Sequence, residues 1–358
     1  METTLWSGRQ AVDIDDLNGP PILAGAQPST LSMNDPDIPA IDMSALWSHD
    51  SGARRRVAHE IGRSCEAIGF LSVSGHGIPR HVTEAAVDAT RRFFAQDAAT
   101  KLKSLRPSGI YRGYIPVMPF GEQRDPRVPK PLYEAFFAGD EKVVNNPGTG
   151  AGSRLYAANI WPDTPEDFRD AIIAYFDHVT AVTHRLLEAF AMALDLEEDA
   201  FTRSFHRHLT NISLLHYPAR PEAIGLPPDD VLPHRDSNMI TVLLPGEVGG
   251  LQVQSPDGRW LDIPHQEDRL VVNIGDELEI WSGGRFASTL HRIHPPRNRA
   301  RYSIGFFAVP DEDAIVAPWP GLEIRGAPEK MAPRRAGEDL AAFIAGFDRF
   351  VDELPAQA

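Results

Sequence analysis

The feature that most constrains the fold is a series of short apolar runs that follows residue 210. The runs are rich in Val, Ile, Leu and Phe, and turn-forming Gly, Pro, Asn and Asp separate them. They cover residues 212–217, 238–244, 250–254, 260–263, 270–274, 278–282 and 301–309. Many short strands at near-regular spacing are typical of a sandwich, a barrel or a jelly roll. This half of the chain is therefore predicted to form a β-rich core.

Helical periodicity marks the segments that flank this core. Apolar residues recur three to four positions apart over residues 53–68, and a second helix is expected over 81–95. A longer helix is predicted up to about residue 195, with Thr164 as its N-cap and Pro165 as its first residue. Apolar residues from 340 to 354 indicate a last helix. The fold class is therefore mainly β with flanking α-helices, including an N-terminal α/β region and a C-terminal helix.

The composition argues against several kinds of protein. The net charge of −15 repels a phosphate backbone and an anionic membrane surface. A single cysteine cannot form an internal disulfide, and we find neither a secretory signal nor an apolar run of about 18 residues. We expect a cytoplasmic, soluble protein, a monomer or weak homo-oligomer, with no nucleic-acid or membrane partner.

One short motif, His234-Arg235-Asp236, carries metal chemistry. On a strand, the side chains of His234 and Asp236 point to the same face, so they could offer one nitrogen and one oxygen to a single ion. The best candidate for a third ligand is His291, 55 residues after Asp236 and beyond several strands. Two imidazoles and one carboxylate with open positions are the ligands of non-haem Fe(II) oxygenases.

Other histidines compete with this interpretation. His206 and His208 follow the long helix two residues apart, and we interpret them as solvated or packing residues of a connecting segment. His294 precedes two prolines and is expected on a loop. A His-x-Asp motif is weak evidence by itself, so its context decides between these candidates.

That context resembles the isopenicillin N synthase-like branch of the Fe(II)/2-oxoglutarate-dependent dioxygenases. The resemblance covers about residues 38–310. The matching motifs are Ile38-Pro39-Ala40-Ile41-Asp42, Gly69 to Ile78, Asn159-Ile160-Trp161-Pro162, His234-Arg235-Asp236, Gly249 to Val253, Val271 to Asp276, His291-Arg292-Ile293 and Arg301-Tyr302-Ser303. The resemblance implies a double-stranded β-helix, or jelly roll, with His234, Asp236 and His291 as the metal ligands.

The resemblance also implies a division of the chain. An irregular lead-in would cover residues 1–36, and an N-terminal dioxygenase region would cover 37–160. The jelly-roll catalytic core with its preceding long helix would cover 161–310, and a C-terminal helical segment 311–358.

Three residues are expected to bind 2-oxoglutarate. Arg301 and Ser303 share a strand face, where a guanidinium and a hydroxyl can hold one carboxylate. In the family this pair holds the distal carboxylate, and a tyrosine that matches Tyr217 lies near it. Leu215 stands where the family usually has asparagine, which puts a contribution from that position in doubt.

The substrate pocket is the least defined part of the site. The residues that match pocket positions in the family, or share strand parity with the ligands, are Arg112, Tyr114, Glu134, Asn159, Asn238 and Phe307. Asn273 is interpreted as a turn residue outside the chemistry, and no catalytic residue beyond the metal ligands is expected.

The implied cofactor is Fe(II), with 2-oxoglutarate and O₂ as co-substrates. The reaction would oxidise an unactivated C–H bond of a small molecule, by hydroxylation, desaturation or cyclisation, and release succinate and CO₂. Asp236 stands where halogenating relatives have a small residue, which argues against halogenation.

Two alternatives stay open. In an oxidase of the isopenicillin N synthase type, Arg301 and Ser303 would hold a substrate carboxylate; in a non-catalytic jelly-roll protein, they would hold a small acid. Retention of Tyr217 favours 2-oxoglutarate, and the intact ligand set favours an enzyme.

Overall fold

The computed structural model describes residues 38–117, 133–144, 154–219, 231–294, 296 and 298–351. The lead-in predicted for residues 1–36 lies outside this range. Within it, no helix is long and apolar enough to cross a membrane.

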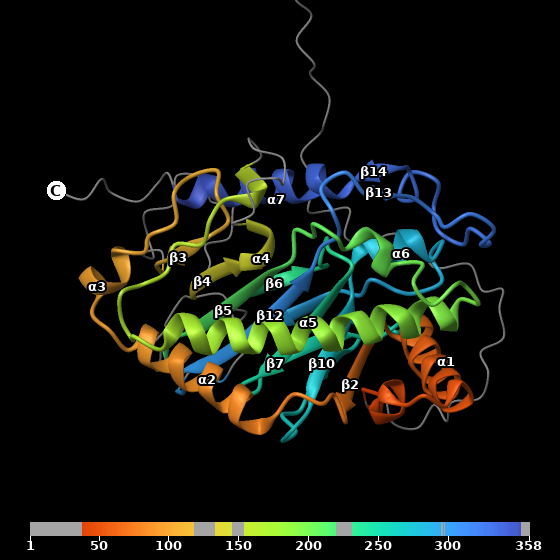
Figure 1. The fold of residues 1–358 in the computed structure, drawn as a ribbon, viewed down its shortest axis with the longest axis horizontal. Helices are drawn as coiled ribbons and strands as arrows, with labels where there is room; N and C mark the ends of the chain where they lie inside the picture. Colours follow the sequence, from red (N-terminus) through yellow and green to blue (C-terminus); the bar gives the residue numbers. More distant parts are fainter. Residues whose placement is uncertain are drawn as a thin grey trace, which may run out of the picture. The chain divides into compact units, whose positions relative to one another are not determined.

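Two β-sheets form the core (Figure 1). The eight-stranded sheet has the order β1 (Ala40–Asp42), β2 (Phe70–Ser74), β10 (Leu270–Ile274), β7 (Ile240–Pro245), β12 (Arg301–Ala308), β5 (Asn211–Tyr217), β4 (Glu134–Gly139) and β3 (Gly113–Ile115). The four-stranded sheet has the order β6 (Val231–His234), β11 (His291–Ile293), β8 (Leu251–Gln254) and β9 (Trp260–Asp262). Apolar side chains of both sheets meet in one buried cluster, and the predicted jelly roll is confirmed.

The large sheet has two different faces because side chains alternate along a strand. Its inner face looks toward the small sheet. Its outer face is covered by helices α5 (Phe168–Ala193), α1 (Ser51–Ala67) and α2 (Arg80–Phe94), and Figure 1 shows α5 crossing the strands. The outer side chains and these helices form the largest apolar core.

Shorter elements complete the fold. They are α3 (Ala98–Leu102), α4 (Glu141–Val144), α6 (Asp276–Trp281), a two-stranded sheet of β13 (Ile315–Val316) and β14 (Arg334–Arg335), and α7 (Ala336–Val351). In α7, Leu340 and Ile344 pack in one cluster with Phe137 of the inner face. Asp348 of the same helix pairs with the fully buried Arg106 at 2.5 Å. The C-terminal helix is therefore attached to the jelly roll near Phe137 of β4.

Two local predictions were wrong. The run 278–282, predicted as a strand, falls on α6 and its C-cap Ser282, because Asp276, Glu277 and Glu279 supply the acidic first turn that favours a helix after Gly275. The long helix begins at Phe168 rather than at Pro165.

Candidate active site

The three predicted metal ligands meet at one end of the small sheet. His234 is the last residue of β6 and lies directly opposite His291, the first residue of β11. Asp236 follows in the turn after β6, so it is turn geometry and not strand alternation that brings it to the histidines. The ligand atoms of the three side chains lie within 4.8 Å of one another. Among the residues that the structure describes, this is the one group of three or more His, Cys, Asp or Glu side chains that converges in this way.

Hydrogen bonds fix the orientation of the Asp236 carboxylate. Its Oδ2 atom accepts from the Thr241 hydroxyl at 2.6 Å and from the Asn273 amide at 2.8 Å. Its Oδ1 atom faces Nε2 of His234 at 3.7 Å and Nε2 of His291 at 3.6 Å. These last distances exceed a hydrogen bond but allow all three atoms to reach one ion between them. Asn273 is thus a strand residue that orients a candidate ligand, and the prediction of a turn residue was wrong.

The same surroundings set the charge of the site. Burial by itself would raise the pKa of Asp236, but the neighbouring His291 and His234, together with the two hydrogen bonds, hold that pKa below its ordinary value. Nδ1 of His291 donates to the Thr289 carbonyl at 3.1 Å, which leaves Nε2 available as a ligand. His291 and Asp236 are buried, whereas the side chain of His234 is 40% exposed, so the site opens on the His234 side.

The three residues predicted to bind 2-oxoglutarate also come together. Arg301 at the start of β12 pairs in register with Tyr217 at the end of β5, and its guanidinium lies 4.9 Å from the centre of the Tyr217 ring. Nη1 of Arg301 donates to the Ser303 hydroxyl at 3.0 Å. All three side chains are buried on the inner face. Leu215 lies opposite Ser303, so an apolar side chain occupies the position where the family has asparagine.

Two of the six predicted pocket residues lie near the candidate ligands. Asn238 donates its amide to the Ile240 carbonyl and to the Thr241 hydroxyl that holds Asp236. Phe307 shares the inner face of β12 with Arg301 and lies opposite Thr241.

The other four have different roles in the structure. The Asn159 amide accepts from the backbone N–H of Gly139 and donates to its carbonyl. Arg112 donates to the backbone carbonyls of residues 111 and 155. Tyr114 and Glu134 are on the outer face, where they bond to each other beneath the helices. This placement argues against a direct contact of Tyr114 or Glu134 with the substrate.

Inner-face residues beside these four were missed. Tyr111 stacks on Phe137 with ring centres 4.2 Å apart and forms a hydrogen bond with Ser213. Burial raises the pKa of Tyr111. The sequence signal was strand alternation along β4: Ala135 and Phe137, rather than Glu134, face inward.

The competing histidines do not converge on a second site. His208 lies 3.3 Å from a carboxylate oxygen of Asp140, and this pair connects the start of β5 to the end of β4. His206 contributes its backbone N–H to Asp311. His294 follows β11 as an exposed residue, as predicted for a loop.

Comparison with known proteins gives consistent matches. Residues 205–310 match the family described as the 2OG-Fe(II) oxygenase superfamily, and residues 38–164 match a family described as the N-terminal region of non-haem dioxygenases in morphine synthesis. The 2-oxoglutarate-Fe(II) type oxidoreductase hxnY of Emericella nidulans is 31% identical over 310 aligned residues, which cover 82% of this chain and 86% of that protein.

Solved structures agree with these matches. A full-length Neurospora crassa protein, crystallised in complex with alpha-KG and thymine, is 26% identical, with 87% of this chain and 97% of that chain covered and a TM-score of 0.74. A Caulobacter crescentus protein of the 2OG-Fe(II) oxygenase family is 30% identical, with 87% and 99% covered and a TM-score of 0.73.

Proposed function

Because this chain belongs to the 2OG-Fe(II) oxygenase superfamily and is an Fe(II)- and 2-oxoglutarate-dependent oxygenase, we propose that His234, Asp236 and His291 hold the iron. The observation that carries this assignment is the convergence of two imidazole nitrogens and one carboxylate oxygen within 4.8 Å. This donor set suits Fe(II) and leaves other positions open.

Arg301 and Ser303 are assigned to the distal carboxylate of 2-oxoglutarate, with Tyr217 beside them. A buried guanidinium can give two hydrogen bonds to a carboxylate, and the neighbouring hydroxyl can give a third. The Tyr217 ring packs against the guanidinium and keeps it from turning away. The intact set Arg301, Ser303 and Tyr217, together with the order of the motifs, supports placing the chain in the isopenicillin N synthase-like branch.

The residues around the metal control orientation and access. Fe(II), 2-oxoglutarate and O₂ together supply the chemistry that oxidises a C–H bond and yields succinate and CO₂. Thr241 and Asn273 keep one oxygen of Asp236 turned toward the histidines. The Thr289 carbonyl accepts from Nδ1 of His291, so the neutral ring presents Nε2 to the site.

We assign the substrate to the inner face of the large sheet, on the side of the metal ligands. The rings on this face are the stacked pair Tyr111 and Phe137 and, beyond β5, Phe307 of β12; Ser213 of β5 adds a hydroxyl. Such a lining suits a small molecule with a planar ring and one or two polar groups. Thymine in the similar Neurospora crassa structure is a molecule of this kind.

The test is succinate formation by the protein supplied with Fe(II), ascorbate, 2-oxoglutarate and O₂. We expect slow turnover in the absence of substrate, and its loss on metal chelation or in Asp236→Ala. Asp262→Ala is the matched control, since Asp262 is an exposed residue of β9 that bonds only Gln252 in the described structure. Full turnover in Asp236→Ala without an added ligand would contradict the metal assignment.

The co-substrate assignment has its own test. Arg301→Leu removes the guanidinium, so the concentration of 2-oxoglutarate needed for half-maximal succinate formation should rise steeply. An unchanged requirement would exclude Arg301 from the co-substrate site.

A further inference from the structure

A buried charged cluster lies on the outer face of the large sheet, behind the residues assigned to 2-oxoglutarate. Its centre is Glu134, the first residue of β4. One oxygen of Glu134 accepts from Nζ of Lys101 at 2.7 Å and from the Tyr114 hydroxyl at 2.5 Å. The other oxygen lies 2.7 Å from Nδ1 of His216 on β5. Glu134 is 4% exposed and Lys101 is 8% exposed, so the cluster is shielded from water.

The contacts of Glu134 keep it ionised despite this burial. Burial by itself would raise the pKa of Glu134, but the hydrogen bonds from His216, Lys101 and Tyr114 outweigh it and hold that pKa below its ordinary value. Hydrogen bonds to a buried carboxylate are stronger than those between neutral groups. Glu134 therefore links β4 to three other elements of the fold, α3, β3 and β5.

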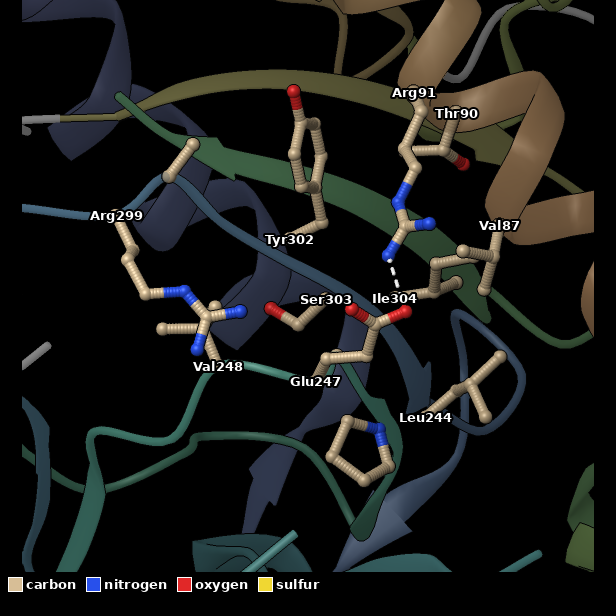
Figure 2. Close-up of a pocket in the computed structure, with 13 residues that line it drawn as sticks. Val87, Thr90, Arg91, Leu244, Glu247, Val248, Arg299, Tyr302, Ser303 and Ile304 are labelled. Carbon is tan, nitrogen blue, oxygen red and sulfur yellow. Dashed lines mark hydrogen bonds and ion pairs between the residues drawn. The ribbon is translucent and has the colours of Figure 1, made fainter. Parts of the chain in front are cut away.

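The cluster continues across β5 onto β12. The His216 ring stacks flat on the Tyr302 ring, with centres 4.4 Å apart and planes 9° apart. Arg91 of α2 lies 5.9 Å from the centre of the Tyr302 ring and pairs with Glu247 at 3.0 Å. Figure 2 shows Arg91, Glu247 and Tyr302 around a cavity of about 200 Å³.

Strand alternation connects the cluster to the co-substrate site. Tyr302 stands between Arg301 and Ser303 on β12, and His216 is the neighbour of Tyr217 on β5. In the ladder, Tyr302 pairs with His216 and Arg301 pairs with Tyr217. The backbone that His216 and Tyr302 hold from the outer face is thus the same backbone that presents the co-substrate side chains on the inner face.

These residues are also at the ends of their strands. β5 ends at Tyr217, β12 begins at Arg301 and β4 begins at Glu134. Backbone pairing is weakest at strand ends, which open locally unless other contacts hold them. Side-chain contacts on the outer face are therefore the means by which the structure fixes this end of the sheet.

We infer that Glu134, His216 and Tyr302 are positioning residues for 2-oxoglutarate, which act by holding the backbone that carries Arg301 and Ser303. None of the three touches the co-substrate. The inference rests on the proposed roles of Arg301 and Ser303, and it assigns a function to residues on the outer face of the large sheet.

Two variants separate the two contacts of His216. His216→Phe keeps a ring that can stack on Tyr302 but loses the bond to Glu134, and Tyr302→Leu keeps that bond but loses the stack. A small displacement of a binding group has a large effect on a bound ligand, so we expect the Kd for 2-oxoglutarate to rise about tenfold in each variant. The Kd is measured by calorimetry on the Fe(II)-loaded protein without O₂. Affinity for Fe(II) should change by less than about twofold, because none of these residues contacts the metal ligands.

The chain provides a matched control at the other end of the same strand pair. His208 and Asp140 also form a histidine–carboxylate pair between β5 and β4, at 3.3 Å. His208→Phe should lower the melting temperature as His216→Phe does, and it should leave the Kd for 2-oxoglutarate unchanged. A purely structural role for His216 would make the two variants behave alike.

A double-mutant cycle tests whether the cluster acts through Arg301. Arg301→Lys should weaken 2-oxoglutarate binding, and adding His216→Phe should then weaken it much less than in the wild-type background. Additive effects would overturn the inference. The inference would also be overturned if the His216→Phe and Tyr302→Leu variants both fold and bind 2-oxoglutarate with the wild-type Kd. If His216→Phe does not fold, Tyr302→Leu and Glu134→Gln carry the same test.

The two proposals fail in different ways. Unchanged 2-oxoglutarate binding in Arg301→Lys and Arg301→Leu would refute the proposed co-substrate site. Weakened binding in those variants, together with normal binding in the His216 and Tyr302 variants, would refute the positioning cluster alone.

Discussion

Replacing Thr241 by valine should weaken metal binding although Thr241 is not a candidate ligand. The Thr241 hydroxyl donates to the buried Oδ2 of Asp236 at 2.6 Å, and valine has nearly the same shape without the hydroxyl. A hydrogen bond to a charged group contributes about 1.5–3 kcal/mol. Asn273 still donates to the same oxygen at 2.8 Å, so the carboxylate keeps part of its orientation.

From these contacts we expect the Kd for Fe(II) to rise about tenfold in Thr241→Val, which corresponds to about 1.4 kcal/mol. Removing both donors, in Thr241→Val with Asn273→Leu, should raise the Kd about a hundredfold. The assay is an anaerobic Fe(II) titration, followed by succinate formation at saturating metal. Saturating metal should restore most of the activity of the single variant.

Thr210→Val is the matched control. Thr210 is a buried threonine whose hydroxyl bonds the Val309 carbonyl and does not contact Asp236. It should reduce stability by an amount similar to that of Thr241→Val and leave the Kd for Fe(II) unchanged. Equal metal affinity in Thr241→Val and Thr210→Val would refute the reasoning, because the bond to Asp236 would then have no effect on the metal.

Three further predictions concern the rest of the molecule. Burial, together with the charge of Asp339, raises the pKa of Glu277 well above 4.5, so the folded state holds a proton that the unfolded chain releases. The free energy of unfolding should therefore fall as pH rises, by at most about 1.4 kcal/mol per pH unit. Glu277→Gln should flatten this dependence, which urea titrations at about pH 5 and pH 8 would measure. Gly139→Ala would put a Cβ atom 2.3 Å from the Arg112 guanidinium and should cost about 1–3 kcal/mol in urea denaturation, whereas Gly249→Ala, with open space around its Cβ, should cost little. Burial raises the pKa of the Cys65 thiol, so thiol reagents should label it only after unfolding, and fast labelling of the native protein would contradict this.

The sequence was most informative where one pattern determined one element. The run 270–274 coincides with β10, and the runs 212–217 and 301–309 differ from β5 and β12 by one residue at one end. Here apolar runs were bounded by turn residues, and neither length nor composition suited a helix. α6 was missed because a short apolar segment fits both periods, and two of the three acidic residues that favour the helix, Asp276 and Glu277, lie before the segment.

The site was predictable to the extent that its residues are chemically distinctive. The ligand types and the Arg301–Ser303 pair are readable from local sequence, although only the fold brings His291 opposite His234. Thr241 could not be identified in this way, because a buried threonine is a common strand residue until its partner is known.

Strand parity separates the predicted pocket residues. Tyr114 and Glu134 lie on the outer face of the large sheet, whereas Ala135, the neighbour of Glu134, lies on the inner face. A strand covered on both faces has apolar residues at every position, so the sequence does not show which alternate set faces the metal.

The alternation along β12 restricts how this enzyme can diversify. Arg301, Ser303 and Phe307 share the interior, and Tyr302 and Phe306 share the helix side. Exchanging Phe307 for another side chain alters the inner face and leaves the helix packing intact. Inserting one residue between Arg301 and Ser303 would put the two side chains on opposite faces and remove either the guanidinium or the hydroxyl from the interior. Relatives that accept new substrates are therefore expected to differ at Phe307 by substitution while the strand from Arg301 to Phe307 keeps its length.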